Sequence, residues 1–249
     1  GVQTCALPIS IDRMTQADAH ADVARLGKRV SCLKLGLEFF VANGPQGVRA
    51  VAGPSPLFLD LKLHDIPNTV AGGVRSACSL NPKFLTIHAS GGEAMMRAAA
   101  EAAKAAGSSR PNLLAITVLT SLDDSDLTAV GQGTPMRDQA RRLAALAKKS
   151  GLDGVVCSAH ELSALRAECG KDFLLVTPGI RPAGADLADQ KRVVTPGEAI
   201  AAGASYLVIG RPIVAAPDPA AAARAVVAEM EDRKSTRLNS SHMSESRMP

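Results

Sequence analysis

Aromatic side chains are scarce in this chain of 249 residues, which has no tryptophan, one tyrosine and five phenylalanines. Because 46% of the residues are nonetheless hydrophobic, the core must be built from aliphatic side chains. The sequence also lacks any run approaching the roughly 18 apolar residues that cross a membrane, so we expect no membrane partner. A chain of this length forms one large domain or two small ones.

Strong charge of one sign and paired cysteines are missing as well. The formal net charge is only +4, and no basic run or aromatic platform marks a surface for nucleic acid. The five cysteines are scattered and include no C-x-x-C pair, which argues against a metal site or a disulfide framework. Free thiols are typical of a reducing compartment, so we expect a cytoplasmic protein.

The two ends of the chain look foreign to the rest. Residues 1–9 lack the basic start of a signal peptide, residues 232–249 show no apolar periodicity, and both resemble translated sequencing-adapter sequence. We therefore expect residues 1–10 to be artefactual, residues 11–231 to form the domain, and residues 232–249 to be an artefactual disordered tail; a genuine disordered terminus is the alternative. Because Pro8 lacks an N–H group, the foreign segment is expected to damage the first strand.

Between these ends, short apolar runs alternate with stretches of helical spacing. The predicted strands are the segment ending at Asp12, then 31–36, 57–63, 83–89, 112–119, 154–157, 173–177 and 205–209. Helix-start signals fall between them, including Thr134 as an N-cap before Pro135. The nearly unbroken apolar strands are typical of a parallel sheet covered on both faces. This pattern predicts an α/β fold, a (β/α)₈ TIM barrel. The alternative, an open doubly wound sheet, lacks its glycine-rich first turn here.

The most informative stretch is residues 57–69, Leu-Phe-Leu-Asp-Leu-Lys-Leu-His-Asp-Ile-Pro-Asn-Thr. Its alternation places Asp60 and Lys62 on one face near the carboxyl end of a strand, and Asp65 follows in the loop. If these groups are buried they must form ion pairs, because an unpaired buried charge is very costly. A surface ion-pair cluster is the alternative for this spacing taken alone.

Polar residues at the carboxyl ends of the strands are the site candidates, because active sites of such barrels lie there. Lys34 sits between leucines at a strand end, which favours a pocket role. Arg211 follows the eighth strand, where many barrels bind phosphate. Thr120 and Ser121 could equally cap a turn, and Gln190 lies in a loop that could close over a ligand or simply cover the surface. The candidates are Asp12, Lys34, Asp60, Lys62, His88, Thr120, Ser121, Arg181, Gly210 and Arg211.

The 57–69 stretch resembles the signature of the orotidine 5′-phosphate decarboxylase family, whose members carry D-x-K-x-x-D-I-P-N-T. The resemblance extends from about Ile11 to about Met230. Further matching segments are Ile11-Asp12, Lys34-Leu-Gly36, Val118-Leu-Thr-Ser121, Val176-Thr-Pro-Gly-Ile-Arg181, Gln190 and Ile209-Gly-Arg-Pro212. The resemblance implies a homodimeric carboxy-lyase of pyrimidine biosynthesis. It would convert orotidine 5′-monophosphate (OMP) to uridine 5′-monophosphate (UMP) and CO₂, without metal or organic cofactor.

The same resemblance implies roles for individual residues. Lys62 protonates C6, Asp60 faces the departing carboxylate, and Lys34 and Asp12 hold the ribose and the charge network. The residues implied to complete the neighbouring subunit's site are Asp65 and Thr69, and Ile66 is a further substrate-binding residue. The residues implied to contact the pyrimidine are Thr120 and Ser121. Those implied to bind the phosphate and close the loop are Arg181, Gln190, Gly210 and Arg211.

Two alternatives come from other functional classes. Metal-dependent sugar-phosphate lyases and synthases share the D-x-K-x-x-D ending, but they place an acidic residue where this chain has Lys34, and a cation there opposes metal binding. An inactive barrel that only binds nucleotides is the other alternative. Every charged position that matches the family is intact, which favours the enzyme.

Overall fold

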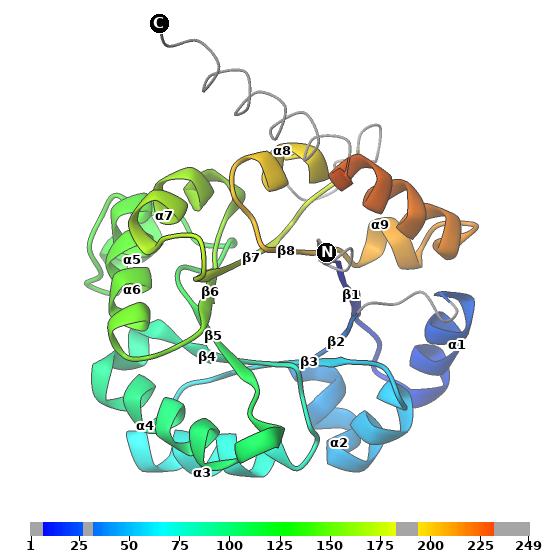
Figure 1. The fold of residues 1–249 in the computed structure, drawn as a ribbon, viewed down its shortest axis with the longest axis horizontal. Helices are drawn as coiled ribbons and strands as arrows, with labels where there is room; N and C mark the ends of the chain where they lie inside the picture. The colour runs from blue at the N-terminus through cyan, green and yellow to red at the C-terminus, as the bar shows by residue number, and fades with distance from the viewer. Residues whose placement is uncertain (1–6, 27–31, 183–193, 232–249) are drawn as a thin grey trace, which may run out of the picture.

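The computed structural model describes residues 7–26, 32–182 and 194–231, in which eight parallel strands form a ring with helices outside it (Figure 1). The strands are β1 (Pro8–Ile11), β2 (Cys32–Gly36), β3 (Leu57–Leu63), β4 (Phe84–His88), β5 (Asn112–Ile116), β6 (Gly154–Val156), β7 (Leu174–Pro178) and β8 (Tyr206–Val208). They pair in chain order, and a bridge from Ile9 to Ile209 brings the last strand back to the first. The predicted (β/α)₈ barrel is confirmed.

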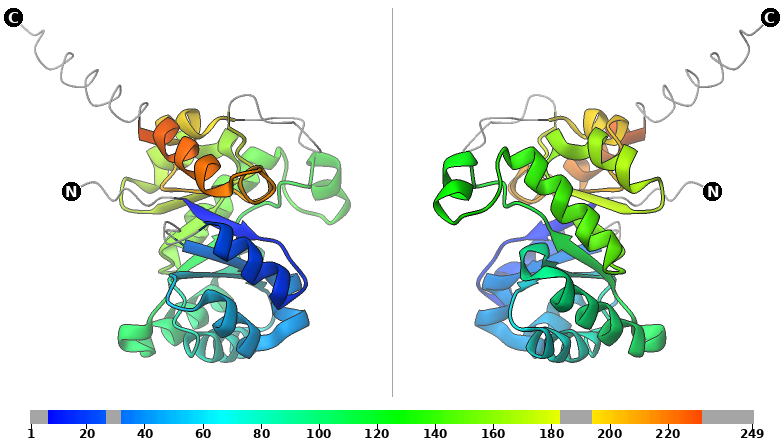
Figure 2. Two further views of the ribbon diagram at one scale, coloured as in Figure 1. Left: turned by 90° about the vertical axis from the view of Figure 1, so that its right-hand side faces the viewer. Right: turned by 90° about the vertical axis from the view of Figure 1, so that its left-hand side faces the viewer.

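The helices surround the strands, as two side views show (Figure 2). They are α1 (Gln16–Leu26), α2 (Leu37–Ala52), α3 (Pro67–Cys78), α4 (Gly92–Ala105), α5 (Asp124–Ala129), α6 (Met136–Lys149), α7 (Leu162–Cys169), α8 (Pro196–Ala201) and α9 (Arg211–Val214). Residues 219–231 form a further helix. No helix in the described part of the chain is long and apolar enough to span a membrane.

The first strand is intact, contrary to the prediction that Pro8 would damage it. Ile9 and Ile11 are buried, and β1 pairs with β2 along its whole length. Pro8 is tolerated because it is the first residue of the strand, where a missing N–H costs little. Its carbonyl still accepts from the Ile209 N–H at 3.2 Å. Residues 1–6 and 232–249, which the sequence predicts to be artefactual, lie outside the described residues.

The start of α6 differs from the prediction. Pro135 rather than Thr134 occupies the N-cap position, and it has no side chain to cap the helix. The Met136 N–H instead donates to the Asp124 carboxylate at 2.7 Å. Asp124 is the first residue of α5, a helix that the sequence patterns did not predict. A tertiary contact therefore supplies the cap that local sequence was expected to supply.

The buried apolar side chains of the described residues form two clusters. The larger one packs the outward faces of the strands against the helices. The smaller one plugs the barrel interior, where the Phe84 ring lies 4.9 Å from Tyr206 and 5.4 Å from Phe58, measured between centroids. Along β3 the same inward face carries Phe58 and then Asp60. The interior thus changes from apolar to charged toward the carboxyl ends of the strands.

Candidate active site

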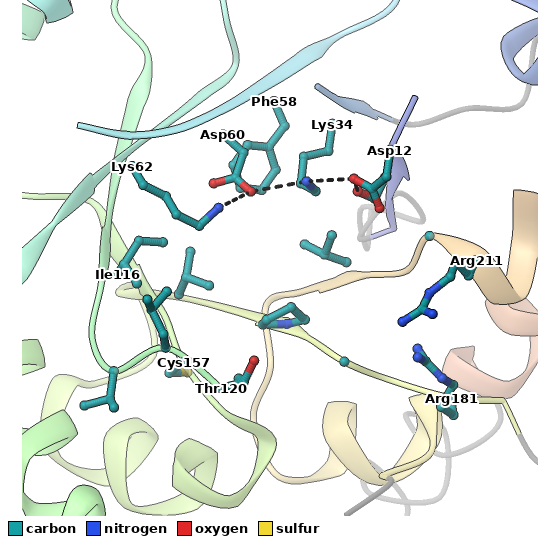
Figure 3. A pocket seen from close by; sticks show the side chains of 18 residues that line it. Asp12, Lys34, Phe58, Asp60, Lys62, Ile116, Thr120, Cys157, Arg181 and Arg211 are labelled. Atoms are coloured by element: carbon teal, nitrogen blue, oxygen red, sulfur yellow. Dashed lines mark hydrogen bonds and ion pairs between the residues drawn. The ribbon is translucent and has the colours of Figure 1, made fainter. Parts of the chain in front are cut away.

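A cavity of about 300 Å³ opens at the carboxyl ends of the strands, above the apolar plug (Figure 3). This volume lies at the small end of the range for ligand pockets. Most of the predicted site residues meet in its wall, although they come from both halves of the chain. They are Asp12, Lys34, Asp60, Lys62, Thr120, Arg181, Gly210 and Arg211.

Asp60 is the centre of a row of alternating charges along one side of the cavity. Its Oδ2 atom lies 2.8 Å from the Lys62 Nζ and 3.2 Å from the Lys34 Nζ. Lys34 in turn approaches Asp12 Oδ1 at 3.7 Å, and Figure 3 shows the four side chains joined in this order. The strands supply these charges in chain order, from β1 to β3. Each lysine therefore has a carboxylate partner within its own chain.

The environment of Asp60 keeps this carboxyl ionised. Burial alone would raise the pKa of Asp60, because it removes water from the charged form. The positive charges of Lys34 and Lys62, with hydrogen bonds from Lys62 and Thr86, outweigh burial and hold the pKa below its ordinary value. With only 8% of its surface exposed, Asp60 is a fixed anion.

The backbone at Lys62 departs from a regular strand. Its φ of 52° lies in the left-handed region, which residues other than glycine seldom adopt. The β3–β4 ladder shifts register between Leu59 and Leu63, so the irregularity is built into the pairing. The Lys62 side chain nevertheless lines the cavity, as the strand alternation predicted. Such backbone strain is concentrated at functional sites.

Two arginines stand on the other side of the cavity. Arg181 follows β7 and Arg211 begins α9, and their guanidinium groups point toward each other (Figure 3). Only 7% of the surface of Arg181 is exposed, so little water screens the charge of its guanidinium group. Guanidinium groups suit phosphate geometry, because they donate parallel hydrogen bonds. This side of the cavity is therefore suited to an anion.

Several predicted residues do not line the cavity. Asp65, Ile66 and Thr69 are exposed, and the Asp65 carboxylate accepts from the Ile66 N–H at 2.6 Å. Within the described residues Lys62 thus pairs with Asp60 and not with Asp65. Ser121 is exposed beside the cavity rather than in its wall. His88, the last residue of β4, does not line the cavity either. The last candidate, Gln190, lies outside the described residues.

Sequence reasoning missed two hydroxyls that hold the acidic groups. The Thr86 Oγ1 donates to Asp60 Oδ1 at 2.8 Å, and the Ser10 Oγ donates to Asp12 Oδ1 at 2.7 Å. Thr86 is a polar residue between Leu85 and Ile87 in the middle of β4, which was the available signal. Ser10 lies in the segment 1–10 that the sequence predicts to be artefactual. Both hydroxyls restrict the orientation of a charged side chain.

The side chains of the cavity are poorly suited to bind a metal ion. In the described part of the chain, no group of three His, Cys, Asp or Glu side chains could hold a metal ion. The two cavity carboxylates, Asp12 and Asp60, are separated by the ammonium group of Lys34. A cation in that position repels a second cation. This donor set favours an anionic ligand.

Residues 6–226 match the family described as "Orotidine 5′-phosphate decarboxylase / HUMPS family". The chain belongs to this family. Curated relatives named orotidine 5′-phosphate decarboxylase include one from Rhodospirillum rubrum, 57% identical over 228 residues, covering 89% of this chain and 92% of the relative. Another from Paramagnetospirillum magneticum is 54% identical over 227 residues, covering 89% and 97%.

Solved structures agree with this family assignment. A crystal structure of orotidine 5′-phosphate decarboxylase from Lactobacillus acidophilus superposes with a TM-score of 0.81 at 39% sequence identity, covering 90% of this chain and 98% of that one. An uncharacterized conserved protein from Geobacillus kaustophilus has a TM-score of 0.80 at 34% identity, covering 90% and 99%. The resemblance first drawn from the 57–69 stretch is therefore confirmed at the level of the family.

Proposed function

We propose that this chain decarboxylates OMP to UMP and CO₂ as a carboxy-lyase of pyrimidine biosynthesis. The observation that carries the proposal is the row of fixed charges on Lys34, Asp60 and Lys62, facing two arginines across one cavity. A nucleotide has a base and a phosphate at opposite ends, and the two sides of the cavity match them. Relatives 50–57% identical to the chain bear the name of this enzyme.

The chemistry requires stabilisation of a carbanion. When the C6–CO₂ bond breaks, its electron pair stays on C6, which has no attached electron sink. Preorganised charge can stabilise such a centre in a site that excludes water. Lys62 supplies that charge, because Asp60 holds its ammonium group at 2.8 Å inside the cavity. The proton then passes from Nζ to C6, and the amine takes up a proton from solvent.

The remaining charged groups prepare this step. Asp60 faces the substrate carboxylate, and their mutual repulsion is relieved as neutral CO₂ leaves. Lys34 and Asp12 hold the ribose and fix the Asp60 carboxylate. Arg181 and Arg211 bind the phosphate, far from the reacting carbon, and provide binding energy that orients the base. The residues proposed to complete the nucleotide site are Thr120, Ser121, Gln190 and Gly210.

The alternatives gain no support from these observations. A metal-dependent sugar-phosphate lyase would need an acidic ligand where Lys34 pairs with two carboxylates. An inactive nucleotide-binding barrel would not need the ion pairs that hold Lys62.

We also propose that the enzyme is cytoplasmic, because the cysteines in the described residues are free thiols, as in a reducing compartment.

We further propose that the enzyme is a homodimer whose sites are completed by the partner chain. Large apolar side chains are exposed in the segments that follow the first three strands, including the first turns of α2. They are Met14, Leu37, Val41 and Ile66, which are 61%, 54%, 76% and 66% exposed. Asp65 and Thr69, which follow the same strand as Ile66, are exposed and do not line the cavity of their own chain. A second copy related by two-fold symmetry would cover the apolar groups and receive Asp65 reciprocally.

The proposed proton donor is tested by Lys62→Ala. Turnover of OMP should fall by at least about 100-fold, because general acid catalysis typically contributes that much or more. The matched control is Lys104→Ala, which removes an exposed lysine of α4 and should leave turnover unchanged. Absorbance of OMP measures the rate, and circular dichroism verifies the fold. Near-normal turnover of Lys62→Ala would remove this residue from the mechanism.

The phosphate assignment is tested by Arg211→Ala. UMP binding should weaken by about 1.5–3 kcal/mol, the usual value for a hydrogen bond to a charged group. Uridine, which lacks the phosphate, should bind almost as before. Titration calorimetry with both ligands measures the difference, and Arg137→Ala on α6 removes an exposed arginine as the control. Equal losses for nucleotide and nucleoside would contradict the assignment.

The shared site is tested by mixing two inactive variants, Lys62→Ala and Asp65→Ala, and allowing subunits to exchange. A heterodimer regains one complete site, in which intact Lys62 meets the partner's intact Asp65. Random pairing makes about half of the dimers heterodimers, so roughly a quarter of the sites should recover by two-fold reciprocity. Activity that stays at the level of the separate variants, despite verified exchange, would show that Asp65 acts within its own chain.

A further inference from the structure

Thr86 connects the two residues at the centre of the charge row. It lies in β4 and is completely buried, at 0% exposure. Its hydroxyl donates to Asp60 Oδ1 at 2.8 Å and accepts from the backbone N–H of Lys62 at 2.9 Å. A hydroxyl can do both at once, because it carries one donor hydrogen and two acceptor lone pairs.

The strand pairing explains why a side chain is needed at this point. Leu59 pairs with Leu85, and the next pair in the ladder is Leu63 with Ile87. Three residues of β3 therefore lie opposite a single residue of β4, Thr86. The last of the three is Lys62, whose left-handed backbone costs free energy in a residue other than glycine. The hydrogen bond from the Lys62 N–H to Thr86 compensates locally for this departure.

The two oxygens of Asp60 have separate partners. Both lysines approach Oδ2, whereas Oδ1 accepts from Thr86. The lysine side chains are long and can follow the carboxylate if it rotates. Thr86 is β-branched and buried, so its χ1 angle is restricted. Its hydroxyl therefore fixes the direction in which Asp60 presents Oδ2 to Lys62.

We propose that Thr86 is a positioning residue for the proton donor, Lys62. Thr86 acts on Lys62 in two ways, directly through the Lys62 backbone N–H and indirectly through the carboxylate of Asp60. This inference rests on the proposed decarboxylase function. It assigns a role to the hydroxyl of Thr86 in β4, which does not line the cavity and would not touch substrate. Misplacing a catalytic group by about 1 Å can reduce a rate about 100-fold, so a single hydroxyl can have a large effect.

The test compares Thr86→Val, which keeps the shape and removes the hydroxyl, with Thr86→Ser, which keeps the hydroxyl. In Thr86→Val, kcat for OMP should fall by about 10- to 100-fold, since the lysine is displaced rather than lost. The Kd for UMP should change little, because Arg181 and Arg211 are untouched. Thr86→Ser should recover most of the lost kcat. If Thr86→Val does not fold, Thr86→Ala takes its place in the same comparison.

A second readout does not depend on turnover. Loss of a hydrogen bond to the charged carboxylate raises its pKa, so Asp60 should titrate at higher pH in Thr86→Val than in the wild type. Carbon-13 NMR of labelled aspartate measures this, with Asp60→Asn identifying the signal. A wild-type protein that lacks turnover would contradict the proposed function, while the Asp60 titration would still test the role of Thr86.

Four results would overturn the inference. The first is a kcat unchanged by Thr86→Val. The second is a parallel loss of kcat and UMP affinity, which would give the side chain only a structural role. The third is a Thr86→Ser variant as slow as Thr86→Val, which would show that the methyl group and not the hydroxyl matters. The fourth is an Asp60 titration that does not move in Thr86→Val.

Discussion

The site depends on one buried carboxylate shared by two lysines. Asp60 would be costly to bury alone, and either lysine would be costly to bury without it. Together they form an arrangement in which each charge is stabilised by its neighbours and none is free to move far. A flexible exposed lysine would lose entropy each time it approached a substrate. Lys62 has already lost that freedom in the folded protein, which is what preorganised charge means physically.

The barrel makes this arrangement possible because consecutive parallel strands end at the same face. Asp12 directly follows β1, Lys34 lies in β2 and Asp60 lies in β3, so their charges alternate from one strand to the next. The arginines come from the last two strand ends, on the other side of the cavity (Figure 3). The separation of the proposed reacting end from the proposed phosphate-binding end is thus a consequence of where along the chain each residue falls. The apolar cluster of the barrel interior lies beneath the charges, and the Asp60 and Lys34 side chains are only 11% and 12% exposed.

Much of this could be predicted from the sequence, because it depends on local patterns. The alternation in Leu57–Leu63 placed Asp60 and Lys62 on one face, and the order of strands placed Asp12, Lys34 and Arg211 at one end of the barrel. The motif beginning at Asp60 identified the family. These features need only the periods of strands and helices and the rule for parallel barrels.

Features that depend on contacts between distant segments could not be predicted. The N-cap role of Asp124 toward Met136 joins two elements, and one of them had no sequence signal of its own. The tolerance of Pro8 depends on its position as the first paired residue of β1, which only the register reveals. The left-handed backbone of Lys62 follows from the shifted pairing with β4. In each case the decisive partner is remote in sequence or is a backbone group.

The central claim is that the chain's own fixed charges, without a metal, drive decarboxylation. The most direct measurement follows the absorbance of OMP, with UMP identified as the product, in the presence and absence of excess chelator. The account predicts stoichiometric conversion to UMP at the same rate in both conditions. No conversion by the folded protein, or a rate that chelator abolishes and a divalent cation restores, would contradict it.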